Sequence, residues 1–305
     1  MNHQRGNGNE PGPLLAVDWG TTSRSAWLIG GDGEVLASVE EGRGMLSIPA
    51  GGWESAFAEL ERDLGGAAPR LSLLAGMVGA DRGWRSTGYL ALPAGIEDLA
   101  RGLCWVEPGA VAIVPGLVLC ADGSADVMRG EETQILGAVA AGLAPAGCFS
   151  CHPGTHTKWI VVDDGRVTTF RTVMTGELFA MLREHSILAD RLRDQVVAGP
   201  DFDSGLERGL AKGETMAELF AVRADVLGGA GRIGNAAAYA SGLLIGADVR
   251  IGLEMCSEHE VHVIGRSDLA AFYARAIEQS GRRAIVIDGE AAVVAGLRRI
   301  GELVE

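Results

Sequence analysis

The sequence predicts an α/β protein of two lobes, and three observations lead to this prediction. The chain has 305 residues, which is enough to bury a large core and to form two lobes. Hydrophobic residues make up 47% of the chain and aromatic residues only 5%, and there are 45 glycines. Such a mixture is typical of turn-rich α/β proteins with close helix–sheet packing. A meander of three short antiparallel strands is also predicted twice, at 14–39 and at 147–173.

In the first half, the ordered chain is predicted to begin with the first meander, whose strands are joined by tight turns containing glycine. Apolar residues at helical spacing predict a helix at 53–64. Apolar runs predict buried strands at 71–79, which enters a glycine loop, and at 111–117. A helix with an acidic first turn is predicted at 128–143.

The second half repeats this plan, since the second meander is followed by a mostly helical region from about 177 to 256. A strand is predicted at 261–267 and a helix with a glycine stop at 269–281. The segment 284–301 is predicted as strand, turn and helix.

These elements define the expected lobes. We place the first lobe at 14–140 and the second at 141–305, with the option that the helix at 290–305 packs back on the first lobe. Residues 1–13 are polar, rich in glycine and proline, and without the apolar segment of a signal peptide, so they predict a disordered tail.

The net charge of −14 makes nucleic acid a poor candidate partner, because no basic stripe is present for a phosphate backbone. No apolar run approaches the roughly 18 residues of a membrane span. The five cysteines are sparse and odd in number, as expected of reduced thiols. We therefore expect a cytoplasmic protein that binds neither nucleic acid nor a membrane.

Several short motifs for haem, zinc or dinucleotide binding match the sequence but lack the surrounding structure that such sites need. Cys148, Cys151 and His152 spell a haem-attachment pattern, but they read as a buried strand and no secretion signal precedes them. His152 and His156 lie in a turn without a third zinc ligand nearby. The G-x-G-x-x-G match at 229–234 follows a helical segment, so it lacks the strand of a dinucleotide site, and no P-loop motif occurs anywhere.

The turn after the first predicted strand carries residues suited to phosphoryl transfer. Asp18 ends a buried apolar strand, where a carboxylate can hold Mg²⁺ through water. Gly20 would let the backbone approach phosphates, while Thr21 and Thr22 supply amide and hydroxyl donors. The alternative is an ordinary hairpin turn, because Asp, Gly and Thr are common turn residues.

The second meander has a matching turn. Gly154, Thr155 and Thr157 place hydroxyl groups beside a glycine, which predicts a second phosphate cradle. A hairpin turn with a surface histidine is again the alternative.

Acidic and basic residues supply the remaining candidates. Glu131 or Glu132, in the first turn of the helix at 128–143, could accept the proton of an attacking hydroxyl, although the helix dipole alone favours acids there. Arg82 and Arg85 could bind a substrate carboxylate, and 171–172 holds further candidates. Solvated arginines are the alternative reading.

Seven segments of the chain form a distinctive series. They are DWGTTSRSAWL (18–28), AGMVGADRGW (75–84), MRGEETQ-LGA (128–138), PGTH-KW (153–159), FRTVMTGEL (170–178), LERGL (206–210) and SGLLIGA (241–247). D-x-G-T-T is shared by many sugar kinases, whereas VMRGEETQ, PGTH-KW and FRTVMTGE are more specific in combination. Together, and in this order, the segments resemble the 2-dehydro-3-deoxygalactonokinase (2-keto-3-deoxygalactonate kinase) family.

The resemblance implies the two-lobed actin/hexokinase-like (ribonuclease H-like) fold, with duplicated mixed-sheet domains and a central cleft. It also implies ATP and Mg²⁺ as cofactors and phosphorylation of the C6 hydroxyl of 2-dehydro-3-deoxy-D-galactonate. Glu131 becomes the first candidate for the base and Glu132 the second, with Asp18 at the metal. The resemblance places the nucleoside near Gly242, Gly246, Gly265 and Ser267, and the sugar acid near Arg24, Met77, Arg82, Trp84, Arg85, Arg171 and Thr172.

The chain departs from the family's pattern in two places. Gly88 stands where proline is expected before the tyrosine, and Arg266 where a smaller residue is usual. Two other functions stay open: a kinase of another sugar acid on the same fold, and a non-catalytic nucleotide-binding regulator. A homodimer is the default expectation for the oligomeric state.

Overall fold

The computed structural model describes residues 12–66, 68–121, 123–211, 213 and 215–304. Most of the predicted N-terminal tail, residues 1–11, lies outside the described residues. The chain divides into two compact units. Unit 1 comprises residues up to 118 together with 127–141 and 293–305, and unit 2 comprises 119–126 and 142–292.

Unit 1 is built on a mixed sheet whose described strands have the order β3-β2-β1-β4-β8-β7. Strands β1, β2 and β3 form the first predicted meander, β1, β4 and β8 are parallel, and β7 is antiparallel to β8. The meander prediction is therefore confirmed. The strands are β1 (Leu14–Trp19), β2 (Arg24–Ile29), β3 (Val35–Glu41), β4 (Leu71–Gly76), β7 (Cys104–Glu107) and β8 (Val111–Ile113).

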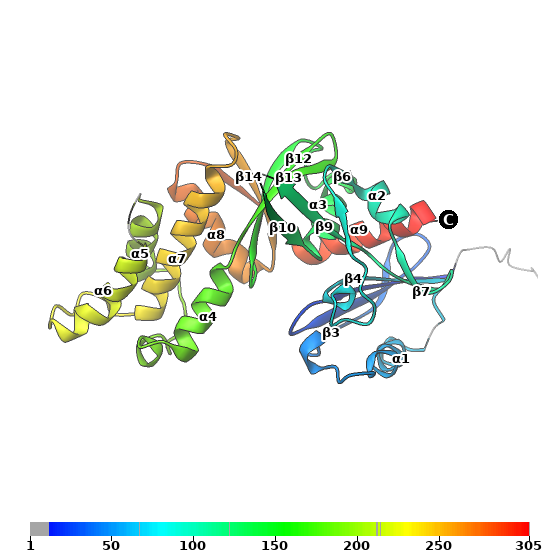
Figure 1. Ribbon diagram of the computed structural model, residues 1–305, viewed down its shortest axis with the longest axis horizontal. Coiled ribbons are helices and arrows are strands. Elements are labelled where there is room, and N and C mark those ends of the chain that lie inside the picture. Colours follow the sequence, from blue (N-terminus) through cyan, green and yellow to red (C-terminus); the bar gives the residue numbers. More distant parts are fainter. Residues whose placement is uncertain (1–11, 67, 122, 212, 214, 305) are drawn as a thin grey trace, which may run out of the picture. The chain divides into compact units, whose positions relative to one another are not determined.

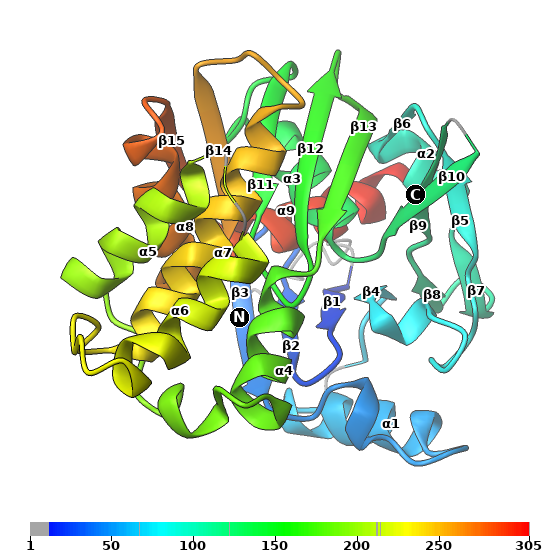
Figure 2. The same ribbon diagram turned by 60° about the vertical axis from the view of Figure 1, so that its left-hand side comes forward.

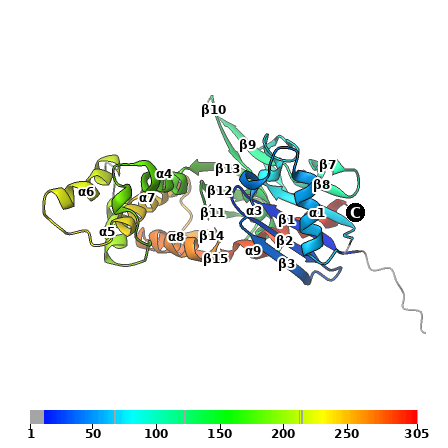
Figure 3. The ribbon, with the colours of Figure 1, turned by 90° about the horizontal axis from the view of Figure 1, so that it is seen from below.

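The two faces of β1 serve different purposes. Leu15, Val17 and Trp19 belong to a buried cluster with apolar residues of helix α1 (Trp53–Asp63), which lies beside β1 and β2 in Figure 3. Successive residues of a strand point to opposite faces, so Asp18 faces away from α1. On that other face, Leu14 lies beside helix α9 (Gly289–Val304), since a Cβ atom on Gly301 would be 3.4 Å from it.

The other elements of unit 1 surround this sheet. Strands β9 and β10 leave unit 1 partway, because 119–126 group with unit 2. The elements are η1 (Met45–Ser47), η2 (Met77–Gly79), β5 (Tyr89–Ala91), β6 (Ala94–Gly95), α2 (Ile96–Arg101), β9 (Gly116–Ala121), β10 (Ser124–Met128) and α3 (Glu131–Ala140).

Unit 2 repeats the plan of unit 1. Its strands have the order β15-β14-β11-β12-β13, with the second predicted meander in β11, β12 and β13 and parallel pairing among β11, β14 and β15 (Figure 2). The strands are β11 (Cys148–His152), β12 (Thr157–Asp163), β13 (Arg166–Val173), β14 (Glu260–Gly265) and β15 (Arg283–Asp288).

The helices of unit 2 fill the interval that the sequence predicts as helical. Figure 1 shows α5, α6 and α7 side by side. They are α4 (Thr175–His185), η3 (Ala189–Arg191), α5 (Pro200–Leu210), α6 (Thr215–Leu227), α7 (Ala236–Leu253) and α8 (Ser267–Gln279).

Helix α7 corrects one expectation from the sequence. Among the described residues it is the one helix long and apolar enough to cross a membrane, with a mean hydropathy of 1.2, although 72% of it is buried. That burial is typical of a core helix. Its glycines bring it close to α5, because a Cβ atom on Gly242 would lie 2.1 Å from the Phe202 carbonyl oxygen.

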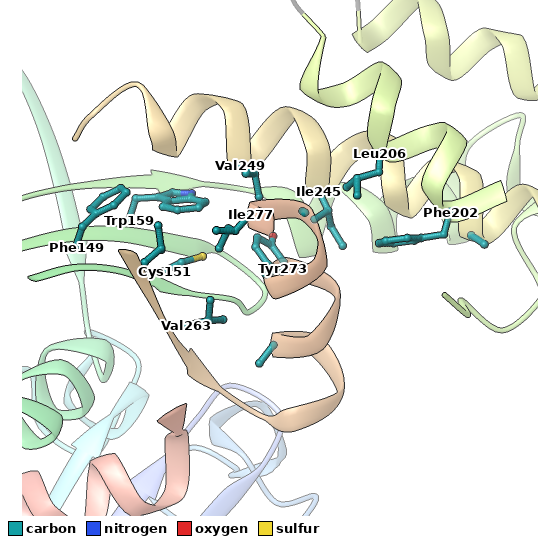
Figure 4. Packing of buried hydrophobic residues seen from close by; sticks show 14 residues of the cluster. Phe149, Cys151, Trp159, Phe202, Leu206, Ile245, Val249, Val263, Tyr273 and Ile277 are labelled. Atoms are coloured by element: carbon teal, nitrogen blue, oxygen red, sulfur yellow. The ribbon is translucent and has the colours of Figure 1, made fainter. Parts of the chain in front are cut away.

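The main core of unit 2 lies between its sheet and the helices α5, α7 and α8. It includes Phe149 and Trp159, whose rings stack at 5.5 Å, and Cys151 and Tyr273 close by (Figure 4). All five cysteines are free thiols. Burial raises the pKa of the Cys148 thiol to about 11, which disfavours the thiolate form.

Candidate active site

Three backbone segments meet in unit 1 where β1 and β4 end and α3 begins. Gly76 ends β4 with a φ of 86°, and a Cβ atom there would come within 3.1 Å of the Asp18 carboxylate. Gly130, with a φ of 109°, precedes α3, and its Cβ position lies 3.5 Å from the Gly76 Cα. Residues other than glycine rarely adopt such φ values, so these two glycines allow the close approach.

This approach brings the predicted acids Asp18 and Glu131 into electrostatic contact. Burial, followed by the negative charge of Glu131, raises the pKa of Asp18 to about 6, while a hydrogen bond from Gln134 opposes the shift. Asp18 and Glu131 are both partly exposed. Unit 1 therefore holds two interacting carboxylates that water and ligands can reach.

The two candidate bases differ in access. Glu132 is fully buried, and both of its carboxylate oxygens accept the Gly130 N–H, at 2.9 and 2.8 Å. Burial, followed by the charge of Glu131, raises the pKa of Glu132 to about 7. Glu131 accepts the Arg129 N–H at 3.1 Å and keeps part of its surface exposed. Of the two, only Glu131 combines solvent access with proximity to Asp18.

Arg129 is a functional candidate that sequence reasoning missed, although it lies inside the quoted VMRGEETQ motif. Its guanidinium donates to the Thr87 hydroxyl and, at 2.9 Å, to the Gly88 carbonyl oxygen. It also lies 4.4 Å from the centre of the Tyr89 ring. Arg129, two residues before the start of α3, thus anchors the loop that follows β4. Gly88 has a φ of 68°, which explains why this chain lacks proline there, since the proline ring fixes φ near −65°.

Arg24 is not a sugar-acid contact in this structure, contrary to the prediction. Its side chain is fully buried, pairs with Glu41 at 2.5 Å and donates to the Ala56 carbonyl oxygen at 2.9 Å. Its guanidinium also lies 4.8 Å from the centre of the Trp19 ring. The arginine therefore joins β2, β3 and α1 and is not available to a ligand.

The other predicted sugar-acid contacts of unit 1 lie in the segment after β4. Met77 begins η2, and Arg82 is exposed. The Trp84 indole donates to Glu54 at 3.2 Å, and the Arg85 guanidinium donates to the Trp105 carbonyl oxygen. Trp84 and Arg85 thus already have protein partners.

Trp84 also lines a pocket of about 510 Å³ on the α1 side of unit 1. Glu54, Phe57, Ser72 and Val111 are among its other lining residues, whereas Asp18 and Glu131 are not. This pocket is consequently separate from the paired carboxylates.

The first predicted phosphate turn follows Asp18 directly. The Gly20 N–H donates to the Ser23 carbonyl oxygen at 2.9 Å, and 44–46 packs against the turn through backbone hydrogen bonds. Thr21 is partly exposed and Thr22 is exposed. The turn is therefore held by its backbone, and the two threonine side chains remain near its surface.

In unit 2, the second predicted phosphate turn lies beside the ends of two other strands. A Cβ atom on Gly265, which ends β14, would be 3.6 Å from the Pro153 carbonyl oxygen. One on Gly289, the first residue after β15, would be 3.0 Å from the Gly265 Cα. Gly289 was not predicted from the sequence, although a glycine between a strand and a helix is a recognisable signal. Unit 2 thus gathers small residues at the ends of β11, β14 and β15.

The start of α4 supports this turn from another side. A Cβ atom on Gly176 would lie 2.4 Å from the Gly154 carbonyl oxygen. The Glu177 N–H donates to the Thr155 carbonyl oxygen at 2.9 Å, and the Glu177 carboxylate contacts His156. Because Gly176 has no side chain, helix and turn can pack backbone to backbone.

Three predicted cofactor contacts have other roles in the structure. Thr157 is fully buried and its hydroxyl hydrogen-bonds to that of Tyr273 at 2.7 Å, so it does not face a ligand. Gly242 and Gly246 lie on the side of α7 that packs against α5, which accounts for both glycines. Ser267, by contrast, is exposed at the start of α8, next to Gly265.

The predicted sugar-acid contacts of unit 2 also differ from one another. Arg171 is exposed on β13. Thr172 donates through its N–H and its hydroxyl to Asp126, at 2.7 and 2.6 Å. Both polar groups of Thr172 thus already serve to attach the segment 119–126 to β13.

The donor set of unit 1 fits a hard, oxygen-preferring cation. No group of three or more His, Cys, Asp or Glu side chains that could hold a metal occurs within the described ranges. Asp18 is nevertheless a poorly solvated carboxylate beside a second negative charge, and both the burial and that charge raise its pKa. Mg²⁺ keeps several waters and needs only one or two carboxylates, so Asp18 suits it.

Comparison with known proteins adds to this geometry. The sequence profile described as 2-keto-3-deoxy-galactonokinase matches residues 18–300. The 2-dehydro-3-deoxygalactonokinase of Escherichia coli (strain K12) is 35% identical over 291 residues, which cover 95% of this chain and 98% of that protein. A crystal structure from Sinorhizobium meliloti, named for the same kinase, is 34% identical with a TM-score of 0.88, and covers 95% of this chain and 98% of that one.

A more distant solved structure shares only the fold. Component A of (R)-2-hydroxyglutaryl-CoA dehydratase from Acidaminococcus fermentans has a TM-score of 0.52 at 14% identity, covering 96% of this chain and 99% of that one. The chain has the α/β fold of the actin/hexokinase-like superfamily, as predicted.

Proposed function

Since this chain belongs to the 2-keto-3-deoxy-galactonokinase family, we propose that it transfers the γ-phosphoryl group of ATP to the C6 hydroxyl of 2-dehydro-3-deoxy-D-galactonate. Membership in this family makes it a sugar-acid kinase that uses ATP. The products are ADP and 2-dehydro-3-deoxy-6-phosphogalactonate. The C6 oxygen forms a bond to the γ-phosphorus, the bond from that phosphorus to the ADP oxygen breaks, and the hydroxyl proton passes to a protein base.

Glu131 is that base. The observation that carries this assignment is the difference in access between two neighbouring acids: Glu131 is partly exposed beside Asp18, whereas Glu132 is buried with both oxygens bonded to the Gly130 N–H. A general base must reach the proton that it removes, and a buried carboxylate does not. Glu132 instead holds the backbone in the first turn of α3.

Asp18 holds Mg²⁺ through water in this proposal. Its position near the end of β1 and the neighbouring charge of Glu131, which raises its pKa, support the role. When bound, the ion supplies positive charge that offsets the negative charge of the phosphates. The amides and hydroxyls of Thr21 and Thr22 lie in the same turn and are positioned to bind phosphate oxygens.

The nucleotide occupies the strand ends of unit 2. Gly154, Thr155, Gly265 and Ser267 are retained from the predicted set, and Gly289 joins them because its backbone lies against Gly265. Helix α9 begins at Gly289 and is capped by Asp288, which accepts the Ala291 N–H at 2.8 Å. A cluster of glycines at strand ends allows phosphates and ribose to approach the backbone.

The carboxylate of the sugar acid binds arginine. Arg82 and Arg171 are exposed, so their guanidinium groups have room to form bidentate contacts. Met77 and the loop that Arg129 anchors complete the sugar-acid side in unit 1.

We further propose that the enzyme is cytoplasmic, that it forms a homodimer, and that it has no nucleic-acid or membrane partners. Light scattering on the purified protein measures the oligomeric state.

The test is ADP release by the purified protein with ATP, with Mg²⁺ or with EDTA in its place. Four acceptors are compared: 2-dehydro-3-deoxygalactonate, its gluconate epimer, galactonate and galactose. We expect turnover confined to the first compound and abolished by EDTA. Turnover with the gluconate epimer alone would show that this epimer, and not 2-dehydro-3-deoxygalactonate, is the substrate. ATP binding without turnover on any acceptor would favour a non-catalytic regulator.

A further inference from the structure

Asp248, on the core helix α7, is connected to the second phosphate turn through buried hydrogen bonds. It is 1% exposed and accepts three hydrogen bonds. The donors are the Trp159 indole N–H at 2.7 Å, the Thr175 hydroxyl at 2.5 Å and the Tyr273 hydroxyl at 2.6 Å. They come from β12, α4 and α8, so a single carboxylate ties three elements to α7.

Two of these links lead to the turn itself. The Tyr273 hydroxyl also hydrogen-bonds to the Thr157 hydroxyl, and Thr157 is the first residue of β12 after the turn. Thr175 begins α4, the helix whose next two residues pack against Gly154 and Thr155. The carboxylate therefore fixes both the exit of the turn and the helix end that supports it.

We propose that Asp248 is a positioning residue for nucleotide phosphates: through Tyr273–Thr157 and through Thr175, it holds the turn 153–156 in the shape that binds them. This inference rests on the function proposed above. Figure 4 shows Trp159 and Tyr273 converging within the core of unit 2 that α7 covers. No ligand would touch Asp248, because it is buried below the turn.

A buried carboxylate is a weak means of stabilising a core. Removing its charge from water has a cost that well-packed apolar residues avoid, and even with good partners such groups contribute little net stability. What three directional bonds do provide is a fixed geometry, because each donor must stay within about 3 Å of one carboxylate. The arrangement therefore favours a role in orientation over a role in stability.

The principal variant is Asp248→Asn, which keeps the shape and replaces one acceptor oxygen with a donor. We expect the Kd for ADP and the KM for ATP to rise about tenfold, the effect of leaving one buried hydroxyl without an acceptor. The KM for the sugar acid should change less than twofold. Adenosine, which carries no phosphate, should bind the variant as it binds the wild type.

A second pair keeps the test decisive where the first variant folds poorly. Thr175→Val removes the hydroxyl at nearly constant volume, whereas Thr175→Ser retains it. We expect Thr175→Val to weaken ADP binding and Thr175→Ser to restore it to within twofold of the wild type.

Ile277→Val is the matched control, since Ile277 is fully buried in the same core on α8 and donates no hydrogen bond to the network. It should lower Tm without changing the Kd for ADP. The proposal is overturned if Asp248→Asn and Thr175→Val bind ADP normally, if adenosine affinity falls in parallel, or if Ile277→Val weakens ADP binding equally. A wild-type protein that binds no ADP would instead refute the proposed function.

Discussion

The two meanders share one backbone plan but end in different chemistry. In unit 1, the last residue but one of β1 is an ionisable carboxylate, Asp18, whose pKa is raised by burial and by a second acid, Glu131. In unit 2, the corresponding strand β11 ends with His152, whose pKa is lowered to about 3 by burial and by the nearby charge of Lys158. His152 is therefore neutral near pH 7, and Pro153 and Gly154 follow it. The first strand of the meander therefore places an ionisable carboxylate near its end in unit 1 and a neutral histidine at its end in unit 2.

The acids of the two units differ in the same way. Asp248 in unit 2 accepts three hydrogen bonds, and these donors oppose the rise in its pKa that burial causes. The pKa of Asp18 is lowered by only one side-chain hydrogen bond, from Gln134, against burial and a neighbouring charge. An acid that the protein leaves under-solvated is suited to a cation or a proton, whereas an acid surrounded by donors orients its neighbours.

Among the variants that test this comparison, Glu131→Gln should have the largest effect on turnover. We expect kcat to fall by about 10²- to 10⁴-fold, since the base is lost, with little change in the KM for the sugar acid. Steady-state ADP release measures both quantities. Glu132→Gln is the matched control and should retain most turnover. The opposite result, with Glu131→Gln active and Glu132→Gln inactive, would move the base to the buried residue.

The raised pKa of Glu132 predicts a pH-dependent effect on stability. Its value of about 7 lies above the ordinary 4.5, so the folded protein retains a proton that the unfolded chain releases between these values. The associated stability is complete below about pH 4.5 and is lost as the pH rises through about 7. At about 1.4 kcal/mol per pKa unit, the loss is about 3 kcal/mol at most.

Glu132→Gln should accordingly stabilise the protein at pH 8 more than at pH 5, because it removes a buried charge that Glu132 carries only at the higher pH. The neutral amide can still accept the Gly130 N–H at both pH values. Urea unfolding at the two pH values measures the difference. An equal change in the free energy of unfolding at both would show that Glu132 does not carry the raised pKa.

The smallest effect concerns the backbone of unit 2. In Gly176→Ala, the new Cβ atom would come within 2.4 Å of the Gly154 carbonyl oxygen, so α4 and the turn must separate. We expect the Kd for ADP to rise about tenfold, equivalent to about 1.4 kcal/mol. Gly147→Ala, where a Cβ atom meets nothing within 4 Å, is the control. Normal ADP binding by Gly176→Ala would mean that this turn does not bind phosphate.

The sequence was sufficient for the family, the α/β class and both meanders, because strand alternation and turn glycines are local signals. It was not sufficient for Arg24, whose position on a strand resembles that of a surface residue until Glu41 and Ala56 fold over it. Nor did it distinguish Gly242, which packs two helices, from Gly265, which lies beside the turn. Such distinctions depend on contacts between residues far apart in the chain.

The same limit applied to the acids. Glu131 and Glu132 are the same residue type in the same helical turn, so the sequence does not distinguish them. The orientation of α3 about its axis leaves Glu131 partly exposed and buries Glu132. Arg129 and Asp248 were missed because their hydrogen-bond partners lie on other elements, between 25 and 89 residues away in sequence.

Helix α9 has a consequence for how the enzyme is made. Its residues from 293 onward group with unit 1, where a Cβ atom on Gly296 would lie 2.2 Å from the Thr133 carbonyl oxygen of α3. The helix that carries Glu131 is therefore fully packed only after residues 293–304 have been translated. Domains of a nascent chain generally fold in the order of their synthesis. Unit 1, although it is synthesised first, can therefore complete its packing only after unit 2 has also been synthesised.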